Sequence, residues 1–179
     1  MAAQALSAGS SAEFVDACAL AAVDAAAARH RGLEVNVGGV SLSFYRARDG
    51  TLTCIETACP HAGHRLCDGY AADPGDIEDL LPGTGVLATC PAHSYVYDTK
   101  TGACLASFGA GAGRCVVRET RINEDRVLVS AEASPETPPL VLPKERSNAI
   151  GMRCVELALD EKFGGLDPIA KDLLRRLLH

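Results

Sequence analysis

Two short segments, each holding one cysteine and one histidine, constrain this chain more than any other feature of its sequence. They read Cys-Pro-His-Ala-Gly at residues 59–63 and Cys-Pro-Ala-His-Ser at residues 90–94, each at the junction of a β-type run and a loop. Thiolate and imidazole are ligands that transition metals prefer, and a proline fixes the local φ angle and so stiffens each loop. The sequence therefore predicts a metal centre held between two loops.

The order of ligands within each segment separates two kinds of metal centre. The four candidate ligands are Cys59, His61, Cys90 and His93. One zinc ion could take all four, but zinc fingers usually keep like ligands together, as Cys-x-x-Cys followed by a histidine pair. Here each segment carries one ligand of each kind, which suits a [2Fe–2S] cluster with two cysteines on one iron and two histidines on the other. A Cys2His2 zinc structural module is the alternative.

These segments resemble the Rieske iron–sulfur family, whose two loops read Cys-x-His-x-Gly and Cys-Pro-x-His. The match continues through an aromatic-rich strand and a Thr-Gly turn, at Tyr95, Tyr97, Asp98, Thr101 and Gly102. The resemblance covers about residues 33–131 and implies a small antiparallel β-barrel or sandwich with a [2Fe–2S] cluster at the tip of two loops. It also implies that Cys59 and Cys90 bind one iron and that His61 and His93 bind the other.

Departures from the family pattern narrow the prediction to its soluble ferredoxins. High-potential members join the two loops by a disulfide, but His64 and Ala92 occupy those positions here, and Cys67 is too displaced to replace the first. In ferredoxin-type members the second histidine usually has Trp and Gly as neighbours, whereas this chain has Ala92 and Ser94. We therefore expect a soluble Rieske-type ferredoxin with a smaller and more hydrated pocket.

The stretch between the two segments is longer than the usual family spacing, and its extra length is acidic. Residues 66–84 contain no Lys or Arg, and their acidic side chains are Asp68, Asp73, Asp76, Glu78 and Asp79. A run of this kind is either a solvated loop or, at residues 68–79, an acidic docking patch that attracts a basic redox partner. Residues 75–79 also resemble a segment of soluble eukaryotic Rieske-domain proteins.

Hydrophobic periodicity and turn residues predict a mainly β chain flanked by terminal helices. Strands are expected at 34–37, 40–46, 51–56, 85–89, 95–98, 114–122 and 126–130, and helices at 12–30, 144–162 and 169–178. The expected parts are an N-terminal helical segment (1–32), a Rieske domain (33–133), a Pro-rich linker (134–143) and a C-terminal helical segment (144–179). Ile169, Leu173 and Leu177 form an apolar stripe that we expect to dock on the core, with a dimer or partner interface as the alternative.

Single residues near the two segments carry further expectations. Tyr97 either donates a hydrogen bond to a ligand sulfur, which would raise the reduction potential, or only packs in the core. His64 is expected to be a loop side chain rather than a ligand. Cys54 and Cys115 are expected to be small buried hydrophobic residues within strands. Cys18 and Cys154 are placed on opposite terminal helices.

Composition excludes some classes of partner. The chain has 17 Lys and Arg against 23 Asp and Glu, four Tyr, four Phe and no Trp, which argues against a nucleic-acid surface. No apolar stretch is long enough to span a membrane, so we expect a soluble protein. The predicted location is the cytoplasm, with a chloroplast or mitochondrial location left open by the Ala/Ser/Gly-rich start of the chain.

The expected function is electron transfer rather than catalysis. We expect a one-electron carrier that passes electrons from a reductase to an oxygenase or another acceptor. These protein partners are expected to dock at the acidic loop of residues 68–79 and at the tip formed by His61 and His93. The alternative is a redox subunit that works only within an enzyme complex. The oligomeric state is not predicted.

Overall fold

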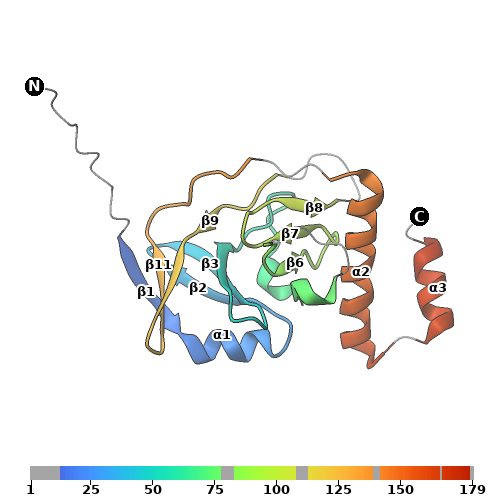
Figure 1. The fold of residues 1–179 in the computed structure, drawn as a ribbon, viewed down its shortest axis with the longest axis horizontal. Helices are drawn as coiled ribbons and strands as arrows, with labels where there is room; N and C mark the ends of the chain where they lie inside the picture. The colour runs from blue at the N-terminus through green and yellow to red at the C-terminus, as the bar shows by residue number, and fades with distance from the viewer. Residues whose placement is uncertain (1–12, 78–82, 108–112, 139–141, 166, 178–179) are drawn as a thin grey trace, which may run out of the picture.

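The computed structural model describes residues 13–77, 83–107, 113–138, 142–165 and 167–177, and it confirms a mainly β antiparallel fold (Figure 1). The strands form three sheets with the orders β1-β11-β10, β2-β3-β4-β9 and β5-β6-β7-β8. Within the described residues, no helix is long and apolar enough to cross a bilayer.

The second sheet is the meander that the turn residues predict. It consists of β2 (Leu33–Val37), β3 (Val40–Arg46), β4 (Leu52–Glu56) and β9 (Val117–Arg118). β2 and β3 pair from Leu33 with Phe44 to Val37 with Val40, across a turn of two glycines. Phe44 and Ile55 are fully buried on opposite faces of this sheet, so both of its faces form part of the core.

The third sheet carries the second Cys/His segment. Its strands are β5 (Ala71–Ala72), β6 (Leu87–Thr89), β7 (Val96–Asp98) and β8 (Cys104–Ala106), and the segment joins β6 to β7. The one-turn helices η1 (Leu66–Asp68) and η2 (Pro74–Asp76) flank β5. The sequence analysis missed β5 and β8, because strands of two or three residues are too short to show an alternating pattern.

The predicted helix at residues 12–30 is wrong in its first half. Phe14–Ala19 forms strand β1, which pairs antiparallel with β11 (Arg126–Ser130), and only Leu20–Ala27 forms a helix, α1. The ladder with β11 satisfies the backbone of β1, and Arg126 donates to both carboxylate oxygens of Asp16 across it. Pairing with a distant strand therefore overrides the helical preference of an alanine-rich segment.

The expected strand at 114–122 is two strands in the structure. β9 pairs with β4, whereas β10 (Thr120–Asn123) pairs with β11, so the chain changes sheets at Glu119. The Ser130 amide donates to the Glu119 carbonyl at 2.9 Å, which anchors this crossing. A continuous β-type sequence does not reveal such a change of partner.

The long C-terminal helix α2 spans Lys144–Phe163 and confirms the helix predicted at 144–162. Gly164 ends it in the left-handed region, with φ 69°. α2 packs against β6 and β8 (Figure 1), and its Ile150 and Cys154 share a buried cluster with Leu87 and Leu105. The four-part division of the chain stays a prediction. β1 and α2 lie outside residues 33–133, but both contact strands within that range.

The last helix, α3, spans Pro168–Leu177 and begins as predicted. The Asp167 carboxylate accepts a hydrogen bond from the Ala170 amide at 2.8 Å, which is an N-cap. The expectation that its apolar stripe docks on the core is wrong for Ile169 and Leu173, which are 73% and 55% exposed. The Leu177 side chain lies outside the described part of the structure.

Candidate metal centre

The two Cys/His segments fold into the same backbone turn. In the first, the Cys59 amide donates to the His64 carbonyl and the Cys59 carbonyl accepts from Gly63, both at 2.8 Å. In the second, the Cys90 amide donates to the Tyr95 carbonyl at 2.7 Å and the Cys90 carbonyl accepts from Ser94 at 3.0 Å. Each loop is thus closed by two backbone hydrogen bonds around its cysteine.

The fifth residue of each turn adopts the left-handed backbone conformation. Gly63 has φ 74° and Ser94 has φ 56°. Glycine takes this conformation without strain, whereas serine adopts it at a cost. The two loops are therefore equivalent in backbone shape although their sequences differ.

The structure brings the four candidate ligands together as two pairs with different exposure. Cys59 and Cys90 are buried, at 2% and 1% exposure. His61 and His93 are exposed, and their rings meet edge to face with centroids 4.8 Å apart. The His61 ring also stacks on Tyr95 at 4.4 Å, which holds one imidazole at the surface above the buried thiols.

The donor set is one that a two-iron cluster can use. Within the described residues, no group of three or more His, Cys, Asp or Glu side chains is arranged to hold one metal ion. A [2Fe–2S] cluster needs only two protein ligands on each iron, and the chain offers a cysteine pair and a histidine pair. Burial raises the pKa of the Cys90 thiol, and a bound metal cation would favour its thiolate form.

A family comparison identifies the domain around these loops. The model of the Rieske [2Fe-2S] domain matches residues 16–120, which is more than half of the chain. The chain belongs to the Rieske [2Fe-2S] domain family. Its cofactor is accordingly a [2Fe–2S] cluster, and the two loops described above lie within the matched Rieske domain. The match also begins inside β1, in agreement with the place of this strand in the first sheet.

Solved structures share the fold of this Rieske domain. The Sphingomonas yanoikuyae B1 ferredoxin is 21% identical with a TM-score of 0.51, and the match covers 67% of this chain and 100% of the ferredoxin. A Mycobacterium tuberculosis protein described as an NADH-dependent nitrite reductase small subunit is 20% identical with a TM-score of 0.53, and the match covers 69% of this chain and 98% of that one.

Another structural match is to a much larger chain. Pseudomonas putida CBB5 NdmB is 21% identical with a TM-score of 0.53 over 66% of this chain, but the match spans only 34% of NdmB. At these identities the likeness shows the fold alone. No curated protein sequence matches the chain. The family match supports a Rieske-type electron carrier, and the small structural neighbours share its fold.

A tyrosine lies directly behind Cys59, one of the candidate ligand cysteines. The Tyr97 side chain is fully buried, and its hydroxyl lies 3.5 Å from Cys59 Sγ. Burial, followed by the nearby Cys59 sulfur, raises the pKa of Tyr97 well above its ordinary value, so the hydroxyl stays protonated and is a donor. The residue therefore combines core packing with contact to the sulfur.

The remaining residues singled out in the sequence lie as follows. The exposed His64 ring is in edge contact with His93, with centroids 5.7 Å apart, and its place beside a candidate ligand was not anticipated. Cys54 and Cys115 are buried as predicted, at 0% and 5% exposure, and burial raises the pKa of both thiols. Cys54 lies on β4, but the prediction of a strand at Cys115 is wrong, because β9 begins at Val117. Cys18 lies on β1 rather than on a helix.

The described carboxylates of the acidic segment beside the Rieske loops are paired with two arginines from outside the segment. Arg48 pairs with Asp73 at 3.4 Å and with Asp76, and Arg65 pairs with Asp68 at 3.6 Å. Burial raises the pKa of Asp73, but backbone hydrogen bonds from Arg48 and Gly75 outweigh burial and leave the pKa below its ordinary value. Glu78 and Asp79 lie outside the described residues.

Proposed function

We propose that Cys59, His61, Cys90 and His93 hold a Rieske-type [2Fe–2S] cluster and that the chain passes single electrons from a reductase to an oxygenase or another acceptor. The observation that carries this proposal is the pair of matched loops, with thiols buried and imidazoles exposed. A bound [2Fe–2S] cluster gains and loses one electron. The buried thiols keep the sulfur side of the site away from water, and the exposed imidazoles bring the other side to the surface.

The exposed imidazoles support partner docking at the tip of the two loops. His61, His64 and His93 are all exposed there and lie in ring contact. The acidic segment at residues 68–79 supports docking less well than its sequence suggests, because its described carboxylates are paired with Arg48 or Arg65. We therefore assign the main electron-transfer contact to the histidine tip.

We propose a carrier rather than an enzyme because the two loops supply ligands for an electron-carrying cluster. A Rieske oxygenase would also need a mononuclear iron site, for which two histidines and one carboxylate are the usual ligands.

A second candidate role is a redox subunit of an enzyme complex. It is favoured by the exposed Ile169 and Leu173 on α3, since apolar side chains at helical spacing that face water are typical of a surface that binds a partner. One of the small structural neighbours is itself described as an enzyme subunit.

Absorption and EPR spectra of the purified protein test the cluster and its ligands. We expect a coloured protein with a rhombic EPR signal after reduction, and we expect His61→Ser or His93→Ser to abolish that signal. His64→Ala is the matched control, because this histidine is exposed at the same tip and is not a proposed ligand; its signal should remain. A colourless protein with stoichiometric zinc would contradict the proposal, as would loss of the signal in the His64 variant.

A further inference from the structure

The most exposed large apolar side chains of the described chain fall in one short stretch around its last helix. Phe163 at the end of α2 and Ile169 and Leu173 on α3 are each more than half exposed. The next most exposed, Ile122 on β10, is 44% exposed. Large apolar side chains that face water together mark a surface that binds another molecule. None of these residues belongs to the loops at 59–64 and 90–95, so this surface is separate from the proposed electron-transfer site.

The sequence of α3 combines its apolar residues with basic ones. The helix holds three basic residues and one acidic residue: Lys171, Arg175, Arg176 and Asp172. The helical period places positions 171 and 175 on the face opposite Ile169 and Leu173. Arg176 pairs with Asp172 at 2.8 Å, so the one carboxylate of the helix is matched within it. The pattern is that of an amphipathic helix with a basic polar face.

Two carboxylates that precede α3 have other partners. Glu161 pairs with Arg31 at 3.0 Å, and the Asp167 carboxylate accepts a hydrogen bond from the Ala170 amide at 2.8 Å. Even with Asp167 included, residues 167–177 hold three basic residues against two acidic ones. This segment is therefore basic within a chain whose formal charge is −6.

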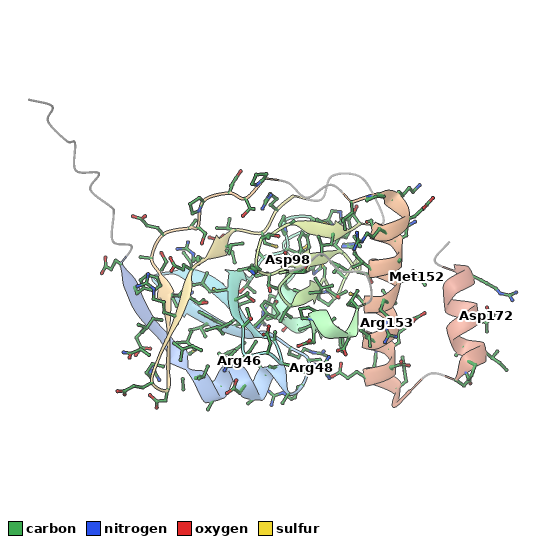
Figure 2. All side chains as sticks on the ribbon, in the orientation of Figure 1. Arg46, Arg48, Asp98, Met152, Arg153 and Asp172 are labelled. Atoms are coloured by element: carbon green, nitrogen blue, oxygen red, sulfur yellow. The ribbon has the colours of Figure 1, made fainter. Side chains whose placement is uncertain are left out.

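α2 separates α3 from the acidic part of the chain. Figure 2 shows α2, labelled at Met152 and Arg153, between the sheets and α3, labelled at Asp172. α2 holds four basic and four acidic residues, so the acidic excess lies outside both helices. A helix with its side chains is about 10–12 Å across, which exceeds the screening length of about 8 Å at physiological ionic strength. The acidic excess therefore has little effect on what binds to α3.

We propose that α3 and the end of α2 bind the surface of a lipid bilayer that carries anionic headgroups. Phe163, Ile169 and Leu173 enter the boundary between headgroups and acyl chains, and the basic residues of α3 contact the headgroups. Lys162 Nζ lies 5.4 Å from the centroid of the Phe163 ring, so a basic group also accompanies this exposed ring.

The same observations favour a bilayer over other occupants of this surface. The exposed apolar side chains extend over two helices, and a flat surface can contact both, whereas a groove on a protein that fits one helix cannot. A second copy of the chain would bring two basic helices together, which repulsion between like charges disfavours.

Sedimentation with lipid vesicles tests this proposal on the cluster-loaded, full-length protein at physiological ionic strength. Anionic vesicles contain equal parts of phosphatidylglycerol and phosphatidylcholine, and neutral vesicles contain phosphatidylcholine alone. We expect the partition constant to be larger by about tenfold or more for the anionic vesicles. Joint replacement by Ile169→Gln and Leu173→Gln should lower it by about tenfold or more. Ile122→Gln is the matched control, because Ile122 is exposed on β10, and it should leave binding unchanged.

A second pair of variants tests the role of charge. Lys171→Gln with Arg175→Gln should lower the partition constant for anionic vesicles by about tenfold and leave that for neutral vesicles unchanged. Lys100→Gln with Arg121→Gln is the control, because both residues are exposed and lie outside α3. Without lipid, the α3 variants should unfold at the same temperature as the wild type, since the replaced apolar side chains face water.

Several outcomes would overturn the proposal. Absence of binding to the anionic vesicles would do so and would leave α3 to a protein partner. Equal binding to both kinds of vesicle or unchanged binding of either α3 variant would also contradict it. So would a dimer in light scattering that the Ile169 and Leu173 replacements dissociate, or a lower unfolding temperature of that variant without lipid. None of these outcomes depends on the cluster's ligands.

Discussion

The loops at residues 59–64 and 90–95 share one backbone turn and differ in the side chains that it carries. Each turn is closed by the amide and the carbonyl of its cysteine, but the histidine follows two residues later in the first loop and three residues later in the second. The fifth position is glycine in one loop and serine in the other, both at positive φ. The same backbone turn therefore carries one thiol and one imidazole in each loop. The residues that surround each loop determine how stable its turn is.

The surroundings of the two loops differ more than the loops do. Behind the first, the Tyr97 hydroxyl reaches Cys59. The second begins at the end of β6, which α2 supports from the other side. Between them, Gly69 approaches the Thr89 backbone so closely that an added Cβ atom would lie 1.7 Å from the Thr89 carbonyl oxygen. The following predictions test each of these supports.

Removal of α2 should have the largest effect and should act through the second loop. Ile150 and Cys154 are buried against the sheet that carries this loop, and each large apolar side chain buried in such a core contributes about 1.5–3 kcal/mol. We expect deletion of residues 144–179 to abolish the visible absorption of the cluster. Deletion of residues 167–179 alone is the control, because Ile169 and Leu173 on α3 are exposed, and it should leave the spectrum intact. Unchanged visible absorption after the longer deletion would show that α2 does not support the second loop.

Gly69→Ala should break the contact between the two loops. A methyl group cannot occupy a position 1.7 Å from a backbone oxygen, so the segment that follows η1 must move away from the strand that leads to Cys90. We expect a loss of more than about 3 kcal/mol in the free energy of unfolding, as for other severe packing errors, measured by denaturant titration. Gly75→Ala is the control, since its added atom would meet only the Asp73 carboxylate at 3.2 Å. Equal stability of the two variants would contradict the prediction.

Substitutions at the fifth position of the two turns should change the free energy of unfolding in opposite directions. Gly63→Ala places a side chain in the left-handed region and should cost about 1–2 kcal/mol. Ser94→Gly removes that strain, and after the larger chain entropy of glycine in the unfolded state it should be neutral or stabilising by up to about 1 kcal/mol. Thermal unfolding of both variants measures the difference, and a destabilised Ser94→Gly protein would show that the serine side chain has another role.

Tyr97→Phe should change the stability of the fold least among these variants, but it should change the reduction potential of the cluster measurably. A hydrogen bond to a ligand sulfur stabilises the reduced cluster, so loss of the hydroxyl should lower the reduction potential. Each kcal/mol corresponds to about 40 mV for one electron, and we expect a decrease of tens of millivolts in a redox titration followed by EPR. Tyr95→Phe is the control on the second loop. An equal shift of the reduction potential in both variants would show that the contact of Tyr97 with Cys59 has no specific effect on the cluster.

Local sequence predicted the parts of the molecule whose geometry depends on neighbours in the chain. The meander from β2 to β4, the left-handed Gly164 at the end of α2 and the Asp167 N-cap all follow from turn and capping residues. The candidate ligands and their order could likewise be predicted from two segments of five residues. These features need no information about distant residues, because ligand chemistry and turn conformation are local properties.

The sequence by itself thus determined the family, the mainly β fold and the candidate ligands. Tertiary structure decided that Phe14–Ala19 is a strand, because only β11 could provide its hydrogen-bond partners. It also decided that Arg48 pairs with Asp73 and Asp76 and that α2 belongs to the core beside the second loop. Each of these outcomes depends on contacts between residues far apart in the chain, and the energy of such contacts outweighs the local preferences that a sequence displays.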